Sequence, residues 1–137
     1  MNILLIDGQG GKMGKKLAEA ITSRFPDETL TVVGTNSVAT STMLKGGASQ
    51  GATGENAVVV CCRKADVIVG PIGIVIADSM LGEITPNMAL AVAQSDAVKI
   101  LIPANRCNNL VAGVKGQSLG EMMDDVLEKI AELAKKY

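Results

Sequence analysis

The residues best suited to chemistry lie in a glycine-rich loop near the start of the chain. Residues 7–14 have the sequence Asp-Gly-Gln-Gly-Gly-Lys-Met-Gly and follow the apolar run Ile3–Ile6. Apolar residues at helical spacing begin within the loop and continue after it, at Met13, Leu17 and Ile21. A glycine loop between a strand and a helix is typical of a phosphate-binding site, because bare backbone and the unpaired N–H groups of a helix N-terminus can bind anionic oxygens.

Each position of the loop has a role in such a site. Gly8 allows a tight turn, Gly10 lets the backbone approach a pyrophosphate, and Gly11 leaves the start of the helix without a Cβ. Gly14 lets the helix lie close to the sheet, and Lys12 adds a cation. We therefore predict that the loop binds a nucleotide, NAD or NADP by preference. The predicted cofactor-binding residues of the loop are Gly8, Gln9, Gly10, Gly11, Lys12, Met13 and Gly14.

The loop resembles that of two enzyme families. The string Gly8-Gln9-Gly10-Gly11-Lys12-Met13-Gly14 is similar to the N-terminal loop of dihydrodipicolinate reductases and prephenate dehydrogenases. The resemblance covers about ten residues and implies NAD(P) phosphate binding at these positions only. Those enzymes have a second, catalytic domain and use histidines, whereas this chain contains no histidine.

Over its full length the chain resembles a family of short bacterial proteins known only as a domain of unknown function. The phrases that carry this resemblance are Gly70-Pro71-Ile72-Gly73, Gly82-Glu83-Ile84-Thr85-Pro86 and Ile102-Pro103-Ala104-Asn105-Arg106-Cys107-Asn108. This second resemblance implies a Rossmann-like fold and no particular activity.

Two other interpretations of the loop remain open. Gly14-Lys15-Lys16 nearly ends a kinase-type phosphate loop, but the first glycine of that motif would fall at Gln9. Lys16 also replaces the hydroxyl residue that binds magnesium in that motif. The other possibility is that residues 8–14 are only a tight connection between a strand and a helix.

Two further segments are candidates for cofactor contacts. Dinucleotide domains place an acid at the end of the second strand, where it binds ribose hydroxyls. The corresponding residues here, 33–37, contain no acid, which favours NADP, and also no arginine to bind its ribose phosphate. Thr35 and Asn36 are the predicted contacts in this segment, with an ordinary helix cap as the alternative. Gly70 and Pro71 follow a later strand and are predicted to pack against a cofactor ring, with a turn into a short helix as the alternative.

Catalytic residues are harder to assign, and Asp7 and Cys107 are the only candidates. Arg106 could lower the pKa of the Cys107 thiol, but the chain has no histidine to act as its base. Asp7, Asp78 and Glu83 could meet as a magnesium site, although scattered carboxylates are usually solvated. We predict no metal site.

Apolar runs of strand length alternate with segments of helical length. Residues 46–56 contain four glycines and are predicted to be a loop, and Ala57–Lys64 fits a strand or, better with the alternation, a helix. Three helices have clear start signals at Asn36 or Ser37, at Thr85-Pro86, and at Ser118, which begins a capping box with Glu121. The predicted strands are residues 3–6, 30–33, 66–69, 98–102 and 110–114.

Strands that are apolar throughout are typically buried on both faces of a parallel sheet. The alternation therefore predicts a single Rossmann-like nucleotide-binding domain over residues 1–137. We expect a three-layer αβα fold of about five mostly parallel strands with helices on both faces. Ligand sites in such sheets lie at the carboxyl ends of the strands. The loops 7–14, 34–37, 70–78 and 103–109 should share that edge.

Composition excludes several classes of function. The 13 basic and 14 acidic side chains and the two aromatic residues argue against nucleic-acid binding. The absence of histidine excludes Ser-His-Asp and Cys-His nucleophile systems. Three cysteines do not resemble a disulfide framework, and no apolar run is long enough for a signal peptide or a membrane span. We expect a cytoplasmic protein that forms a homo-oligomer.

Three functions fit these observations. The first is a nucleotide-binding protein with a sensing role, or with a redox role for which a second subunit completes the site. The second is a small histidine-free enzyme that acts on a phosphorylated or carboxylated metabolite, with Asp7 and Cys107 as candidates for its chemistry. The third is a structural or interaction subunit that binds no nucleotide.

Overall fold

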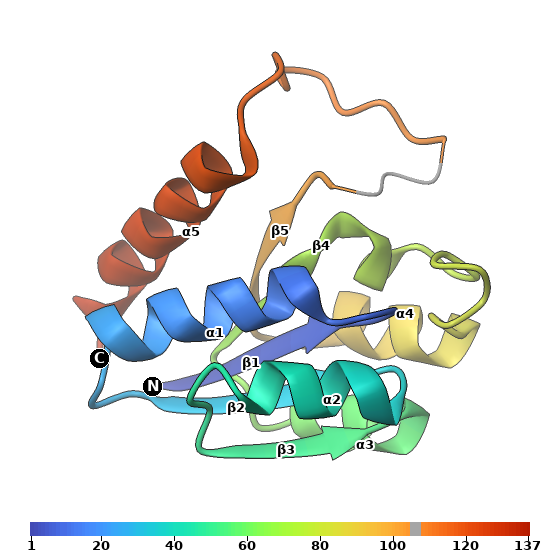
Figure 1. Cartoon of the computed structure of the whole chain (residues 1–137), viewed down its shortest axis with the longest axis horizontal. Helices are drawn as coiled ribbons and strands as arrows, with labels where there is room; N and C mark the ends of the chain where they lie inside the picture. The colour runs from blue at the N-terminus through green and yellow to red at the C-terminus, as the bar shows by residue number, and fades with distance from the viewer. Residues whose placement is uncertain (105–107) are drawn as a thin grey trace.

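Five parallel strands form the centre of the molecule (Figure 1). The computed structural model describes residues 1–104 and 108–137. The strands are β1 (Asn2–Asp7), β2 (Thr29–Gly34), β3 (Gln50–Thr53), β4 (Val67–Pro71) and β5 (Val98–Ile102). Their order across the sheet is β3-β2-β1-β4-β5, and every neighbouring pair is parallel.

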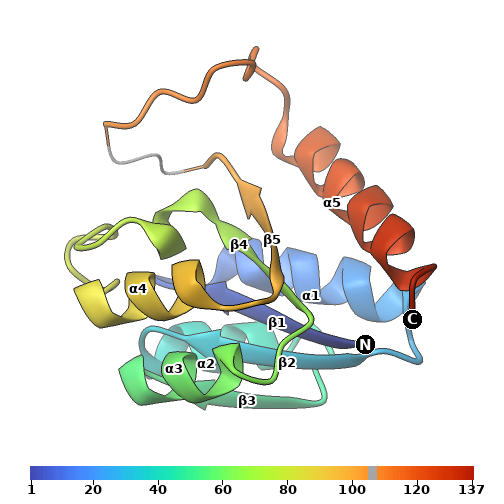
Figure 2. The same cartoon turned by 180° about the vertical axis from the view of Figure 1, so that it is seen from behind.

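Helices cover both faces of this sheet (Figure 2). On one face α1 (Lys12–Arg24), α2 (Ser37–Leu44) and α5 (Leu119–Ala134) contribute to one hydrophobic core. On the other face α3 (Glu55–Cys62), α4 (Pro86–Gln94) and the short 3-10 helix η1 (Ile72–Val75) contribute to a second core. The predicted three-layer Rossmann-like fold is confirmed.

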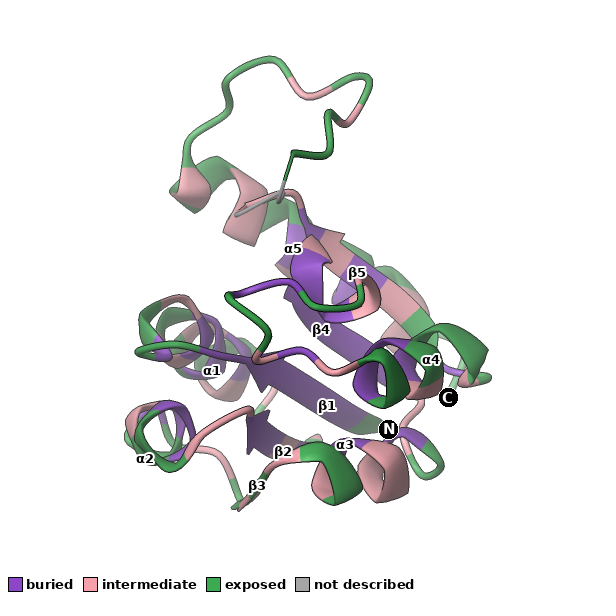
Figure 3. Ribbon diagram, turned by 90° about the vertical axis from the view of Figure 1, so that its right-hand side faces the viewer, coloured by how far each residue is buried: buried purple, intermediate pink, exposed green. Residues whose placement is uncertain are grey.

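The central strand explains why the fold forms. Side chains of β1 alternate between the faces, so that Ile3 and Leu5 enter one core while Leu4 and Ile6 enter the other. All four are at most 2% exposed, and Figure 3 shows the strand buried in the middle of the sheet. A strand buried on both sides must be apolar throughout, as its sequence is.

The predicted helix starts are confirmed by their caps. The Asn36 side chain accepts a hydrogen bond from the Ala39 N–H at 2.9 Å, and Thr85 accepts one from the Met88 N–H at 3.1 Å. Ser118 accepts a bond from the Glu121 N–H at 3.1 Å. Because each cap satisfies a helix N–H that has no partner in the helix, these residues fix where α2, α4 and α5 begin. In the described part of the chain, none of the helices has the length and apolar content needed to span a membrane.

Two of the predicted elements are wrong. Residues 46–56 contain the strand β3, which has no apolar run and is held by its pairing with β2 from Thr31–Gln50 to Gly34–Thr53. Residues 110–114 are not a strand, because the chain turns there and the Val114 N–H donates to the Val111 carbonyl at 3.3 Å. They lie in an irregular connection, residues 108–117, that extends away from the sheet before α5 (Figure 1).

Candidate functional site

The glycine loop joins the carboxyl end of β1 to the start of α1, as predicted. The Gly11 N–H donates to the Gly8 carbonyl at 2.9 Å, which closes a tight turn. Gly11 is the N-cap of α1 and has φ +73°, a conformation that residues with a Cβ rarely adopt. A Cβ on Gly11 would also lie 2.8 Å from the backbone of Ala39 in α2. The fold therefore requires glycine at this position.

Gly8 and Gly14 are also explained by close packing. A Cβ on Gly14 would lie 2.5 Å from the Met43 sulfur and 2.9 Å from the Asp7 Cβ. A Cβ on Gly8 would lie 2.7 Å from the Met80 sulfur. Both glycines let neighbouring elements approach the loop, so neither is evidence for a ligand.

Gly10 is different. A Cβ on Gly10 would meet no atom within 4 Å, and its φ lies outside the left-handed region. Among the described glycines only Gly120 shares this freedom from both backbone and packing requirements. Nothing in the fold requires glycine at position 10, and the space in front of it is open to a ligand.

That space belongs to a pocket of about 480 Å³. Lys12 and Lys16 border it, are exposed, and form no ion pair with any described residue. Leu119 at the start of α5 closes the opposite side. The pocket brings together all of the predicted loop residues except Gly14. Its lining residues are Asp7, Gly8, Gln9, Gly10, Gly11, Lys12, Met13, Lys16 and Leu119.

Backbone donors face this region at the start of α1. Within the described residues, the N–H groups of Gly10, Lys12 and Met13 donate to no acceptor. Unpaired N–H groups at a helix N-terminus carry a partial positive charge and favour anionic oxygens. With the two lysines, they make the pocket suitable for a phosphate or pyrophosphate.

The Asp7 carboxylate takes two of the backbone N–H groups of this loop. One carboxylate oxygen accepts a bond from the Gly8 N–H and the other from the Gly14 N–H, each at 2.8 Å. The residue is 6% exposed. Burial raises the pKa of Asp7, the two backbone hydrogen bonds offset part of that rise, and the negative charge of Glu83 adds to it. The Asp7 side chain therefore holds the two ends of the loop together by its hydrogen bonds to Gly8 and Gly14. Because its pKa is raised, we expect the charge of this carboxyl group to change with the pH of the solution.

The raised pKa predicts a pH-dependent cost to folding. The carboxyl group contributes its full stability below the unfolded-state value of 3.8, and the contribution is lost as pH rises through the higher folded-state pKa. Asp7→Asn removes this titration. It also removes one of the two backbone bonds, because the amide nitrogen of asparagine cannot accept a hydrogen bond, at a cost of about 1–3 kcal/mol.

We expect the free energy of unfolding of the wild type, minus that of Asp7→Asn, to fall as pH rises from about 4 towards neutrality. Urea unfolding of both proteins across this range measures the difference, in which all other titrating groups cancel. A difference that is constant or rises with pH would contradict the raised pKa.

Glu83 brings an acid to the end of β2. One of its carboxylate oxygens, Oε1, accepts bonds from the Thr35 hydroxyl at 2.6 Å, the Asn36 side-chain amide at 2.8 Å and the Gln9 N–H at 2.8 Å. Burial alone would raise the pKa of Glu83, but these hydrogen bonds outweigh it and lower the pKa. The carboxylate is therefore ionised at neutral pH. Residues 33–37 themselves contain no acid, and the acid at this position comes from the β4–α4 connection.

An unusual turn holds Glu83 in place. Met80 and Leu81 both have φ +56°, in the left-handed region that residues with a Cβ rarely adopt. The turn is fixed by the Glu83 N–H donating to the Met80 carbonyl at 3.1 Å and by Ser79, whose hydroxyl donates to the Gly73 carbonyl. From the sequence, Glu83 is only a possible metal ligand, because no sequence signal connects residue 83 to residues 35 and 36.

The structure supports no metal site among the described residues. No three of the histidine, cysteine, aspartate and glutamate side chains in that part of the chain lie close enough to share an ion. Asp78 is exposed, and its side chain takes no part in the hydrogen bonds of Asp7 and Glu83.

The other catalytic candidate, Cys107, lies outside the described residues, as does Arg106. Burial raises the pKa of Cys62 to about 11, which makes it an unreactive core thiol.

Gly70 and Pro71 do not join the pocket lining. They are the last two residues of β4, both are buried, and η1 begins directly after them. A Cβ on Gly70 would lie 2.5 Å from the Ile6 carbonyl oxygen, so glycine here permits the close pairing of β1 with β4. The predicted contacts Thr35 and Asn36 lie instead beside Gln9, which links them to the pocket.

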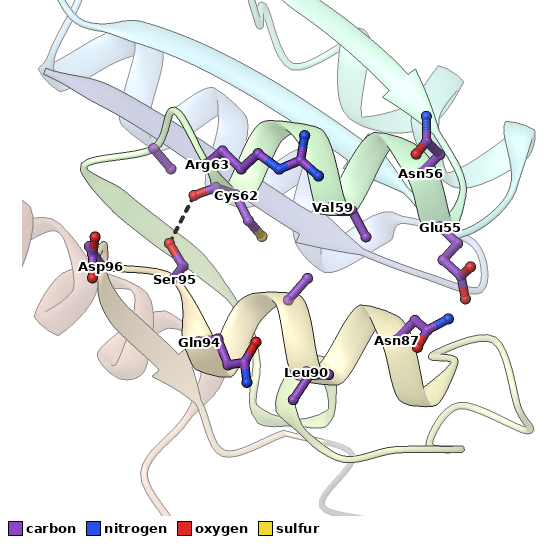
Figure 4. Close-up of a pocket in the computed structure, with 12 residues that line it drawn as sticks. Glu55, Asn56, Val59, Cys62, Arg63, Asn87, Leu90, Gln94, Ser95 and Asp96 are labelled. Atoms are coloured by element: carbon purple, nitrogen blue, oxygen red, sulfur yellow. Dashed lines mark hydrogen bonds between the residues drawn. The ribbon is translucent and has the colours of Figure 1, made fainter.

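A second cavity of about 640 Å³ lies between α3 and α4 (Figure 4). The Ser95 hydroxyl donates to the Cys62 carbonyl at 2.8 Å at one end, and the exposed Leu90 borders the middle. The other polar side chains that border it, among them Arg63, Asn87 and Gln94, are exposed. This cavity has the character of a groove between packed helices.

An all-parallel sheet with a glycine loop after its first strand defines a Rossmann-like α/β protein. The family model described as a domain of unknown function (DUF3842) matches residues 2–135, and the chain belongs to this family. The full-length resemblance stated from the sequence is thus confirmed.

No curated protein matches the chain, so the resemblance of the loop to the two dehydrogenase-type families receives no support. Among solved structures, the chain is similar to a dodecameric FMN-dependent UbiX-like decarboxylase from Escherichia coli O157:H7. The identity is 13%, the TM-score is 0.49, and the match covers 96% of this chain and 95% of that chain. At this level of identity and TM-score, the ligand and activity of that enzyme do not transfer to this chain, and they have to be inferred from the site itself.

Proposed function

We propose that this protein binds a nucleotide, NAD(P)(H) by preference, in the pocket at the glycine loop. The observation that carries the proposal is Gly10, because the fold does not need a glycine there and the space before it is open. A glycine at such a position lets the backbone approach a pyrophosphate more closely than any other residue allows.

The chemistry around Gly10 supports a pyrophosphate. The N–H groups of Gly10, Lys12 and Met13 have no acceptor among the described residues, and the Lys12 and Lys16 ammonium groups border the same pocket. A pocket of about 480 Å³ is within the range of small-molecule sites. Phosphate groups at the start of α1 would also lie at the carboxyl ends of the strands. This is the edge at which open α/β sheets bind ligands.

The proposed role is sensing or regulation by the bound nucleotide, or a redox reaction whose substrate site a second subunit completes. The chain has no histidine, and the described residues contain no reactive thiol beside the pocket.

Thermal unfolding in the presence of candidate ligands tests the proposal. The panel contains NADH, NADPH, NAD, FMN, ATP with Mg²⁺, and coenzyme A. A ligand present at about 100 times its Kd adds roughly 2.7 kcal/mol, which raises Tm by several degrees in a domain of this size. We expect a shift with NAD(H) or NADP(H).

Each other result has a definite meaning. A shift with ATP and Mg²⁺ alone would favour the kinase-type phosphate loop, and a shift with FMN alone would replace the dinucleotide by a flavin. No shift with any ligand would refute nucleotide binding by this protein and favour a structural role.

A further inference from the structure

At the end of β2, the two carboxylate oxygens of Glu83 differ: one accepts hydrogen bonds from the protein and the other does not. Its Oε1 atom accepts all three hydrogen bonds, from Thr35, Asn36 and Gln9. Its Oε2 atom accepts no hydrogen bond from any described residue. One half of the carboxylate is therefore held rigidly, and the other half keeps its lone pairs for a ligand.

The bonds to Glu83 set its position relative to the pocket. Gln9 lines the pocket and donates its N–H to Glu83, while its carbonyl accepts a bond from the Asn36 amide at 3.0 Å. Asn36 is itself fixed, because its side-chain oxygen caps α2. Glu83 is thus hydrogen-bonded to Gln9, the residue before Gly10, on the side of the loop that faces the end of β2.

A carboxylate with a free oxygen recognises a pair of adjacent hydroxyl groups and repels a phosphate. Asn36 donates to Glu83 and to Gln9, and Thr35 donates to Glu83, so both side-chain donors of this segment are already used. No arginine or lysine side chain interacts with this cluster among the described residues. The cluster thus offers nothing to neutralise a 2′-phosphate.

We propose that Glu83 determines ribose specificity: its free oxygen binds the hydroxyls of an unphosphorylated ribose, so that the site takes NAD(H) and rejects NADP(H). This proposal rests on the proposed function above. It is the opposite of the preference for NADP that we expected from the absence of an acid in residues 33–37. The acid reaches this position from the β4–α4 connection, by way of the turn at Met80 and Leu81.

Titration of NADH and NADPH against the purified protein, with ligand fluorescence as the signal, tests this inference. For the wild type we expect NADH to bind at least about tenfold more tightly than NADPH, the effect of one charged hydrogen bond. In Glu83→Gln, which removes the charge and keeps the shape, we expect the ratio of the two Kd values to fall by about tenfold.

Asp78→Asn is the matched control. Asp78 is an exposed acid in the same connection, its side chain has no hydrogen bond among the described residues, and asparagine tolerates its φ of +66°. We expect this variant to keep the wild-type ratio. Because a neutral amide oxygen accepts the three hydrogen bonds at residue 83 more weakly than a carboxylate does, Thr35→Val supplies a second test: it removes one of those bonds, keeps the charge, and should lower the ratio by a smaller factor.

The outcomes separate this inference from the proposed function. Binding of both ligands with equal affinity, or a ratio that Glu83→Gln leaves unchanged, would overturn the role of Glu83 and leave nucleotide binding intact. Tighter binding of NADPH than of NADH would overturn it in the same way. Failure of the folded wild type to bind either ligand would overturn both proposals.

Discussion

Gly10→Asp is expected to abolish nucleotide binding while the folded protein remains as stable as the wild type. The new side chain has a Cβ that meets no atom of the protein within 4 Å. Its charge would lie beside the pyrophosphate, where two like charges about 4 Å apart repel by about 4 kcal/mol at the effective dielectric constant of a protein surface. Such repulsion corresponds to a loss of more than 100-fold in affinity.

Gly10→Asn is the matched control, because asparagine has the size of aspartate without its charge. Titration with NADH should show a smaller loss for Gly10→Asn than for Gly10→Asp, and urea unfolding should show no loss of stability for either. Unchanged binding by Gly10→Asp would show that the ligand does not approach this residue. Unfolding of both variants would show that glycine at position 10 has a structural role.

Gly11→Ala, one residue further along the chain, should in contrast lower the stability of the folded protein. Its φ of +73° costs a residue with a Cβ about 1–2 kcal/mol, and the Cβ would overlap the backbone of Ala39 at 2.8 Å. Relief of that overlap requires α2 to move, at a further cost of about 1–3 kcal/mol. We expect a total loss of roughly 2–5 kcal/mol, or a fall in Tm of roughly 10–20 °C.

Gly10→Ala provides the comparison for this experiment. An alanine in open space with ordinary backbone angles restricts the unfolded chain, so this variant should be as stable as the wild type or up to about 1 kcal/mol more stable. Thermal and urea unfolding of the two alanine variants give the contrast directly. Equal stabilities would mean that Gly11 tolerates a Cβ and that α1 begins in a different way from that described here.

The fold could be predicted from the sequence because its signals are local. Continuous apolar runs predict buried parallel strands, and Asn36, Thr85 and Ser118 mark the helix starts by their own side chains. The strand β3 gave no such signal, since its Gln-Gly-Ala-Thr sequence is polar and it is held by pairing with β2 and by hydrogen bonds with Thr40. A strand of that kind depends on tertiary context.

The candidate site was only partly predictable for the same reason. The glycine loop is contiguous, so its position after β1 and before α1 follows from the sequence. The sequence could not distinguish Gly10, which the fold leaves free, from Gly11, which the fold requires. It also could not place Glu83 beside Thr35 and Asn36, because a turn with left-handed residues brings together segments that are distant in sequence.

The place of Leu119 in the lining of the pocket at the glycine loop has a consequence for how this protein acquires that pocket. The loop and β1 are synthesised early, whereas Leu119 opens the helix at the other end of the chain. That helix is held on the sheet by Val126 and Ile130, which are buried in the core shared with α1. A growing chain therefore completes the sheet before the pocket has all its walls. We therefore expect the pocket to be completed late in folding, and fraying of the C-terminal helix to open it.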